Sequence, residues 1–73
     1  MHKISVFSSK GDSAVAVWED QDVGAIQAAK ELFDTAVSEG WGAVTPTKDG
    51  AARVDEFSPE LDEIFLLKPI AGG

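Results

Sequence analysis

Cysteine is absent from this 73-residue sequence, and its absence excludes several classes of function. Without cysteine the chain has no disulfide bond, no thiolate zinc site, no cysteine-ligated iron–sulfur cluster and no cysteine nucleophile. Small secreted domains usually depend on disulfides, so a chain of this size without them is expected in the reducing cytoplasm.

Long apolar runs and positive charges are also scarce. The stretch Met1–Phe7 has no long apolar run and soon turns polar, so neither a signal peptide nor a membrane span is expected. Six Lys and Arg stand against 13 Asp and Glu, a formal net charge of -7. Such a surface repels phosphate backbones, so nucleic-acid binding is not expected. Most of these acids are interpreted as solubilising charge, with attraction to a basic partner as the functional alternative.

The length limits the architecture. This sequence has room for one domain, and a chain so short buries only about 60% of the surface that its unfolded form exposes. A wide internal substrate cavity is therefore not expected. Apolar residues make up 44% of the sequence and include two tryptophans and four phenylalanines. That composition supports one small core and is not typical of a disordered chain.

The N-terminal part predicts an antiparallel hairpin. Alternating apolar residues mark two strands, Lys3–Ser8 and Ala14–Trp18, joined by a glycine-containing turn. On the second strand Val15 and Val17 share one face, and Trp18 lies on the other. Tryptophan is more often a core residue than an interaction anchor, but its opposite parity also makes Trp18 a candidate for contact with solvent and a partner.

A helix is predicted next, over Val23–Glu39, where the sequence is alanine-rich and free of proline. Asp20 or Asp22 is expected to cap its N-terminus. Gly40 is expected to end it, because glycine adopts the left-handed conformation without strain. Apolar residues spaced three and four apart predict the buried stripe of this helix, which consists of Ile26, Ala29, Phe33, Ala36 and Val37.

The following segment predicts a second hairpin. Trp41–Thr45 is expected to form a strand that ends at Pro46. The pair Asp49-Gly50 predicts a tight turn, and Ala52–Phe57 is expected to supply the return strand.

The last segment completes the predicted sheet. Ser58–Asp62 is expected to form one helical turn, and the apolar run Ile64–Leu67 predicts a central strand covered on both faces. The order of elements indicates an α+β domain, a mixed sheet of four to five strands packed on one main helix. With the last strand inserted between the first and the third, this becomes the β-grasp arrangement. Residues 1–70 are expected to form that single domain and 71–73 a flexible tail.

The residues after the last predicted strand suggest a function. They are Lys68-Pro69-Ile70-Ala71-Gly72-Gly73, and a diglycine without Cβ atoms can pass through a narrow tunnel between protein walls. The stretch 62–73 carries an acidic pair, an apolar strand, a proline, an aliphatic residue, a small residue and the diglycine. It resembles the ubiquitin-like β-grasp proteins, and most of all their sulfur-carrier branch, the small subunit of molybdopterin synthase and the thiazole-synthesis sulfur carrier. Small bacterial and phage-encoded ubiquitin-like proteins are also similar.

The resemblance implies that the Gly73 carboxylate is adenylated and then either thiocarboxylated or joined to lysine, with Gly72 as its side-chain-free approach. The implied partners are a ubiquitin-activating-type adenylating enzyme and either a sulfur-accepting synthase subunit or target-protein lysines. No enzyme activity, cofactor or metal site is expected, and the chain is expected to be monomeric alone. The expected docking residues are Ile70, Leu67, Pro69 and Trp18.

Other interpretations remain open. His2, the single histidine, is expected to be solvated, and the acidic clusters 19–22 and 55–63 lack the spaced ligands of a calcium loop. The chain is alternatively a non-conjugated binding module, which uses an acidic surface or the face or edge of its sheet as immunoglobulin-binding ββαββ domains do. A third class is a subunit that inserts its tail into a partner's active site. Gly72-Gly73 is otherwise only a frayed end.

Overall fold

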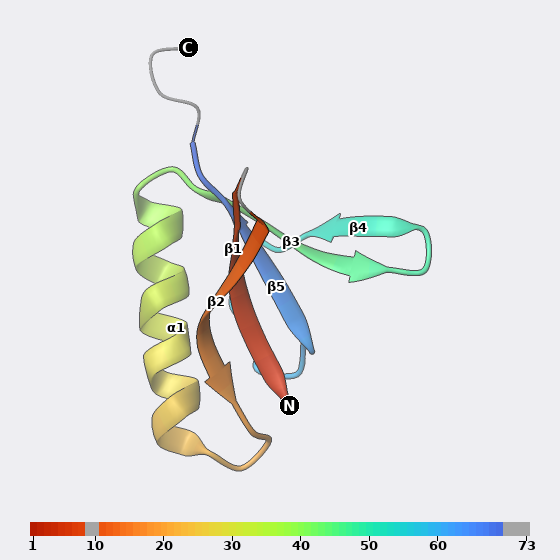
Figure 1. The fold of residues 1–73 in the computed structure, drawn as a ribbon. Coiled ribbons are helices and arrows are strands. Elements are labelled where there is room, and N and C mark those ends of the chain that lie inside the picture. Colours follow the sequence, from red (N-terminus) through yellow and green to blue (C-terminus); the bar gives the residue numbers. More distant parts are fainter. Residues whose placement is uncertain (9–10, 70–73) are drawn as a thin grey trace.

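In the computed structural model, which describes residues 1–8 and 11–69, the last strand of the chain lies in the middle of a five-stranded mixed sheet (Figure 1). The one helix of these residues packs against one face of that sheet, so the predicted α+β class is confirmed. The elements in chain order are β1 (His2–Ser8), β2 (Gly11–Trp18), α1 (Val23–Ser38), β3 (Gly42–Thr47), β4 (Gly50–Arg53) and β5 (Glu63–Leu67).

The order of the strands in the sheet is β2-β1-β5-β3-β4. Strand β5 pairs in parallel with β1 and antiparallel with β3, while the pairs β1–β2 and β3–β4 are antiparallel. A parallel pair needs a long crossover between its strands, and here the chain from β2 through β4 provides it. The predicted insertion of the last strand between the first and the third is confirmed.

Helix α1 begins at Val23 as predicted and ends at Ser38, one residue before the predicted end. The Asp22 side chain accepts a hydrogen bond from the Ala25 amide at 3.0 Å and caps the N-terminus. Gly40 follows the helix with a φ of 91°, a conformation that favours glycine. Three members of the predicted stripe are buried, Ile26 is half-buried, and Val37 is exposed at its margin; the buried members are Ala29, Phe33 and Ala36.

The core lies between α1 and the sheet face that the helix covers. Trp18 is only 1% exposed there, and its indole N–H donates a hydrogen bond to the Pro59 carbonyl at 3.1 Å. The idea that Trp18 faces solvent and a partner is therefore wrong. Trp18 and Val17 do point to different faces of the sheet, as predicted. The helix covers the face that carries Trp18, because burying this larger side chain removes more apolar surface from water. The buried apolar residues are Ile4, Trp18, Ala29, Phe33, Ala36, Ala43, Val54, Ile64 and Leu66.

Strand β5 is central but is not covered on both faces. Ile64 and Leu66 are buried, Phe65 is half-buried, and Leu67 is exposed. The prediction of a doubly covered strand is wrong because the described chain has one helix, which covers one face only. An unbroken apolar run conceals this difference between the two faces.

The second hairpin also differs from the prediction. Strand β3 continues through Pro46 to Thr47, and β4 ends at Arg53, well before Phe57. The Val54 amide donates to the Ala43 carbonyl. The backbone N–H and C=O groups of the odd-numbered residues of β3 are therefore directed towards β4. The Pro46 nitrogen therefore points away from β4, and its missing N–H costs no bond within the hairpin.

Two connections differ from the prediction. The first is shorter, because β2 begins at Gly11 and not at the predicted Ala14, and Gly11 and Asp12 already pair with β1. Ser58–Asp62 contains a hydrogen-bonded turn, from the Leu61 amide to the Ser58 carbonyl at 3.3 Å, and not a turn of helix.

Phe33→Ala tests the packing of α1 on the sheet. The free energy of unfolding is expected to fall by about 3–5 kcal/mol, because the Phe33 side chain is almost fully buried under the helix and contacts the Phe57 ring. A domain of this length has a total stability of about 4–11 kcal/mol, so the urea midpoint measured by circular dichroism should fall steeply. The control is Val23→Ala in the same helix, where Val23 is 77% exposed and the change should stay within about 0.5 kcal/mol. Equal losses in the two variants would contradict this packing.

Candidate functional site

The chain leaves the sheet from its centre. Leu67 is the last residue of β5, and it pairs with Phe7 of β1 on one side and with Gly42 of β3 on the other. The chain continues beyond the end of β5 (Figure 1), and Lys68 and Pro69, which follow there, are exposed. Whatever follows Pro69 therefore starts from the middle of one end of the sheet. The predicted tail 71–73, with Gly72 and Gly73, lies outside the described residues, and so does Ile70.

An apolar surface lies beside this exit. Four side chains of the sheet face opposite α1 surround a hollow of about 210 Å³, and we call them the open-face patch. Phe7 is 58% exposed and Leu67 is 39% exposed. The strand register places the members next to one another in the pairs Phe7–Leu67 and Val44–Phe65. The open-face patch consists of Phe7, Val44, Phe65 and Leu67.

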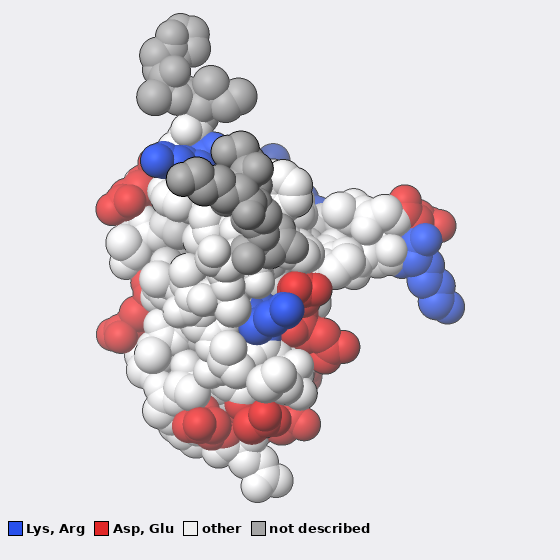
Figure 2. Space-filling model, viewed as in Figure 1, with Lys and Arg blue, Asp and Glu red and all other residues white. Residues whose placement is uncertain are grey.

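The same sheet face becomes charged away from the exit. Lys3 on β1 and Glu63 on β5 are register partners, and their side chains form an ion pair of 3.4 Å. Acidic side chains are spread over much of the visible surface, whereas the basic ones stand apart from one another (Figure 2). The open-face patch is thus an apolar area on a strongly acidic molecule, and contiguous exposed apolar areas are where proteins contact partners.

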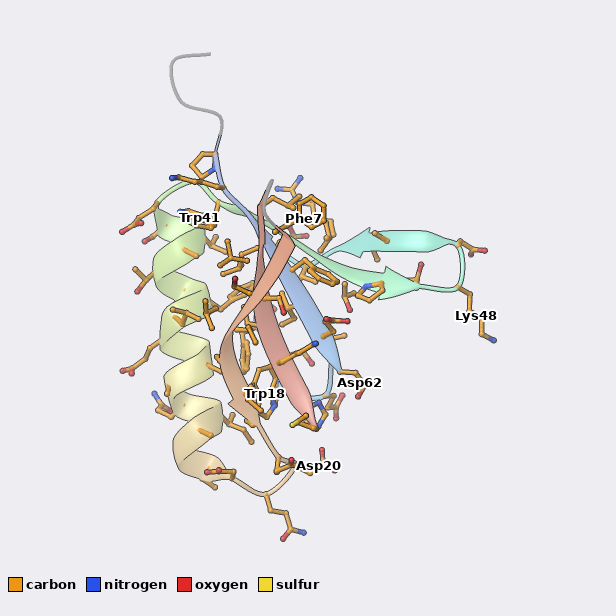
Figure 3. The ribbon with its side chains drawn as sticks, in the orientation of Figure 1. Phe7, Trp18, Asp20, Trp41, Lys48 and Asp62 are labelled. Carbon is orange, nitrogen blue, oxygen red and sulfur yellow. The ribbon has the colours of Figure 1, made fainter. Side chains whose placement is uncertain are left out.

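His2 lies at the other end of the sheet and is buried, only 6% exposed. Its Nδ1 is 2.9 Å from the Leu61 carbonyl oxygen, and its Nε2 is hydrogen-bonded to an Asp20 carboxylate oxygen. The ring stacks on Trp18 with centroids 5.5 Å apart and planes 10° from parallel. Figure 3 shows Trp18, Asp20 and Asp62 together at this end, and Phe7 and Trp41 at the end of the tail exit.

The expectation of a solvated His2 is therefore wrong. His2 has the same strand parity as Ile4, so alternation along β1 places it on the covered face. That signal was present in the sequence. The hydrogen-bonding partners of His2 were not recognisable, because Asp20 and Leu61 are brought to it by the β1–β2 pairing and by the loop before β5.

The hydrogen bond between His2 and Asp20 changes the pKa of both groups. The pKa of His2 is raised above 6.5, chiefly by the Asp20 hydrogen bond and next by the Leu61 carbonyl. The pKa of Asp20 is lowered, chiefly by the hydrogen bond from His2. Each group thus stabilises the charged form of the other.

A scan of protein-family models and searches of curated proteins and solved structures found no match for this chain. In the part of the chain that the structure describes, no helix is long and apolar enough to cross a membrane. Among residues 1–8 and 11–69, no group of three or more His, Cys, Asp or Glu side chains is placed to hold a metal ion.

The docking residues expected from the sequence do not lie together. Leu67 and Pro69 lie exposed together at the exit of the chain, while Trp18 lies in the core at the other end of the sheet. Three members of the open-face patch, Phe7, Val44 and Phe65, were missed. Their parity within each strand was visible, but only the strand order brings β1, β5 and β3 side by side.

Phe7→Ser tests whether the open-face patch is available to ligands. The fluorescence of the hydrophobic dye 1-anilinonaphthalene-8-sulfonate with the native protein should fall, because the variant removes the most exposed apolar side chain of the patch. Stability should change by no more than about 0.5 kcal/mol. Val17→Ser is the matched control, since Val17 is 48% exposed on β2 but lies outside the patch. An equal loss of dye binding in both variants would refute a local site.

Proposed function

We propose that this protein is a ubiquitin-like carrier or modifier, activated at the Gly73 carboxylate by an adenylating enzyme. The observation that carries the proposal is the place of β5. As the central strand it directs the chain out of the sheet at Leu67, next to the open-face patch. The strand order and the parallel β1–β5 pair are compatible with the β-grasp arrangement expected from the sequence.

The chemistry requires an activated carboxylate. The Gly73 carboxylate attacks the α-phosphate of ATP, which forms an acyl adenylate and releases pyrophosphate. Sulfide then displaces AMP to form a thiocarboxylate, or a lysine amine displaces AMP to form an amide and loses a proton. Gly72 lets the chain end approach closely because it has no side chain. In this proposal the chain is the substrate and supplies no catalytic residue or cofactor.

The open-face patch is the proposed docking surface for the adenylating enzyme. Leu67 belongs both to the patch and to the exit, so a partner bound there holds the domain directly beside the emerging chain. Pro69 and Ile70 extend the proposed contact beyond the strand. The net charge of -7 favours a partner whose apolar contact has a basic rim, because opposite potentials speed association.

A non-conjugated binding module is the second candidate. It is favoured by the patch itself and by the hairpin of β3 and β4, which projects from the sheet with Lys48 at its tip (Figure 3). Among the residues that the structure describes, β4 is the last strand in the sheet order and all four of its residues are exposed, so this hairpin offers an edge for pairing. Such a module needs the patch or the edge but does not need Gly73.

Deletion of Gly73 tests the first candidate. The full chain is incubated with ATP, sulfide and host-cell extract, and its intact mass is measured. The wild type should gain the mass of an adenylate or exchange an oxygen for sulfur, and the chain without Gly73 should remain unmodified. Phe7→Ser should slow the modification because it weakens docking, while Val17→Ser should not.

The same variants separate the two candidates. If the wild type is never modified and deletion of Gly72 and Gly73 leaves partner capture unchanged, the carrier hypothesis fails. Capture that is lost in Phe7→Ser but retained in the deletion variant would then support the binding module.

A further inference from the structure

Both nitrogens of the His2 ring face oxygen atoms that only accept hydrogen bonds. The Leu61 carbonyl has no proton to donate, and the Asp20 carboxylate is ionised because its pKa is lowered. A neutral imidazole carries one N–H, whereas the imidazolium carries two. The observed geometry is satisfied in full only by the protonated ring.

The ring connects three parts of the chain that are distant in the sequence. His2 begins β1, Asp20 lies in the loop between β2 and α1, and Leu61 lies in the loop that leads into β5. The ring itself is buried against Trp18, while the Asp20 side chain stands at the surface. A buried polar group that loses a hydrogen-bond partner destabilises the folded state, so the protonation of His2 bears on the position of both loops.

The charges around the ring favour the imidazolium. A second carboxylate, that of Asp62, has an oxygen 3.7 Å from Nδ1. The Met1 amino group opposes the ring charge but is itself 3.7 Å from the Glu19 carboxylate. Lys3 and Glu63, next along β1 and β5, form an ion pair with each other. The nearest charged groups that face the ring are therefore two carboxylates against one amino group.

We propose that His2 is a proton-operated latch, which as an imidazolium ties the β2–α1 loop and the loop before β5 to the start of β1. When the ring loses one proton, one of its nitrogens has no hydrogen to donate. The hydrogen bond to either Asp20 or the Leu61 carbonyl is then lost. The sheet remains formed, because backbone ladders join its strands. The loop before β5 also keeps two bonds, from the Lys3 amide to the Asp62 carbonyl and from the Trp18 indole to the Pro59 carbonyl, so the larger displacement is expected of the β2–α1 loop. The latch lies at the end of β5 opposite the chain exit, so it is independent of the proposed activation at Gly73.

The direction of the pH dependence follows from the two shifts. The folded protein binds the His2 proton more tightly than the unfolded chain, since the pKa of His2 is raised above 6.5. The stabilisation by the latch is therefore complete below that value and is lost as the pH rises through the pKa of folded His2. On the acid side it is lost as the pH falls through the lowered pKa of Asp20. The latch is thus closed at mildly acidic pH and opens on the alkaline side.

The titration of His2 by NMR is the direct test, and it is unambiguous because the sequence contains one histidine. The ring nitrogens of the 73-residue protein should titrate with a midpoint above 6.5. The backbone amides of 20–22 or of 61–63 should shift with the same midpoint, while that of Leu67 should not. A wild-type midpoint at or below 6.5 would overturn the proposal.

Asp20→Asn is the decisive variant, because an amide can donate to the unprotonated Nε2 and satisfies the neutral ring. Its His2 midpoint should fall towards 6.5, and the decline in urea stability between about pH 5.5 and about pH 8.5 should flatten. Asp49→Asn, at the tip of the β3–β4 hairpin, removes the same charge far from the ring. If the His2 midpoint fell equally in this control, the change in net charge alone would explain the effect, and the latch would be refuted. A wild-type stability that rises over this pH range would refute it as well.

Discussion

One helix covers one face of the described sheet, and most other features of the structure depend on this constraint. Between this face and the helix, Trp18 of β2, Phe33 of α1 and alternate residues of β1 and β5 are buried. The opposite face keeps its apolar residues at the surface around the end of β5. A small two-layer domain of one sheet and one helix has no third layer with which to bury them. Its open face is therefore available for contact with another molecule.

The parallel pairing of β1 with β5 places a different group of residues at each end of the sheet. At one end the pairing places Phe7 beside Leu67, where the chain leaves the sheet. At the other end it places the start of β1 beside the loop before β5, where the His2 ring reaches the Leu61 carbonyl. Docking and activation are proposed for the first end and proton sensing for the second. The ladder of β1 and β5 joins the two ends.

Local patterns in the sequence predicted much of the fold, because they follow from contacts between near neighbours. The cap at Asp22, the glycine after α1 and the buried helical stripe were all recognisable. The errors arose where pairing partners decide the outcome. Pro46 remains within β3 because its nitrogen points away from β4, and Trp18 is buried because of the side on which the helix packs. Neither fact is contained in the local sequence.

The sequence by itself determined the α+β class, the helix and its ends, the acidic surface, the absence of thiol chemistry, and the diglycine on which the functional hypothesis is based. These properties depend on composition, periodicity and short-range backbone preferences. Only the tertiary structure decided which sheet face stays open, which residues form the patch beside the exit, and that His2 lies between Asp20 and Leu61. Those contacts join residues far apart in the chain, and they exist only once the strand order is set.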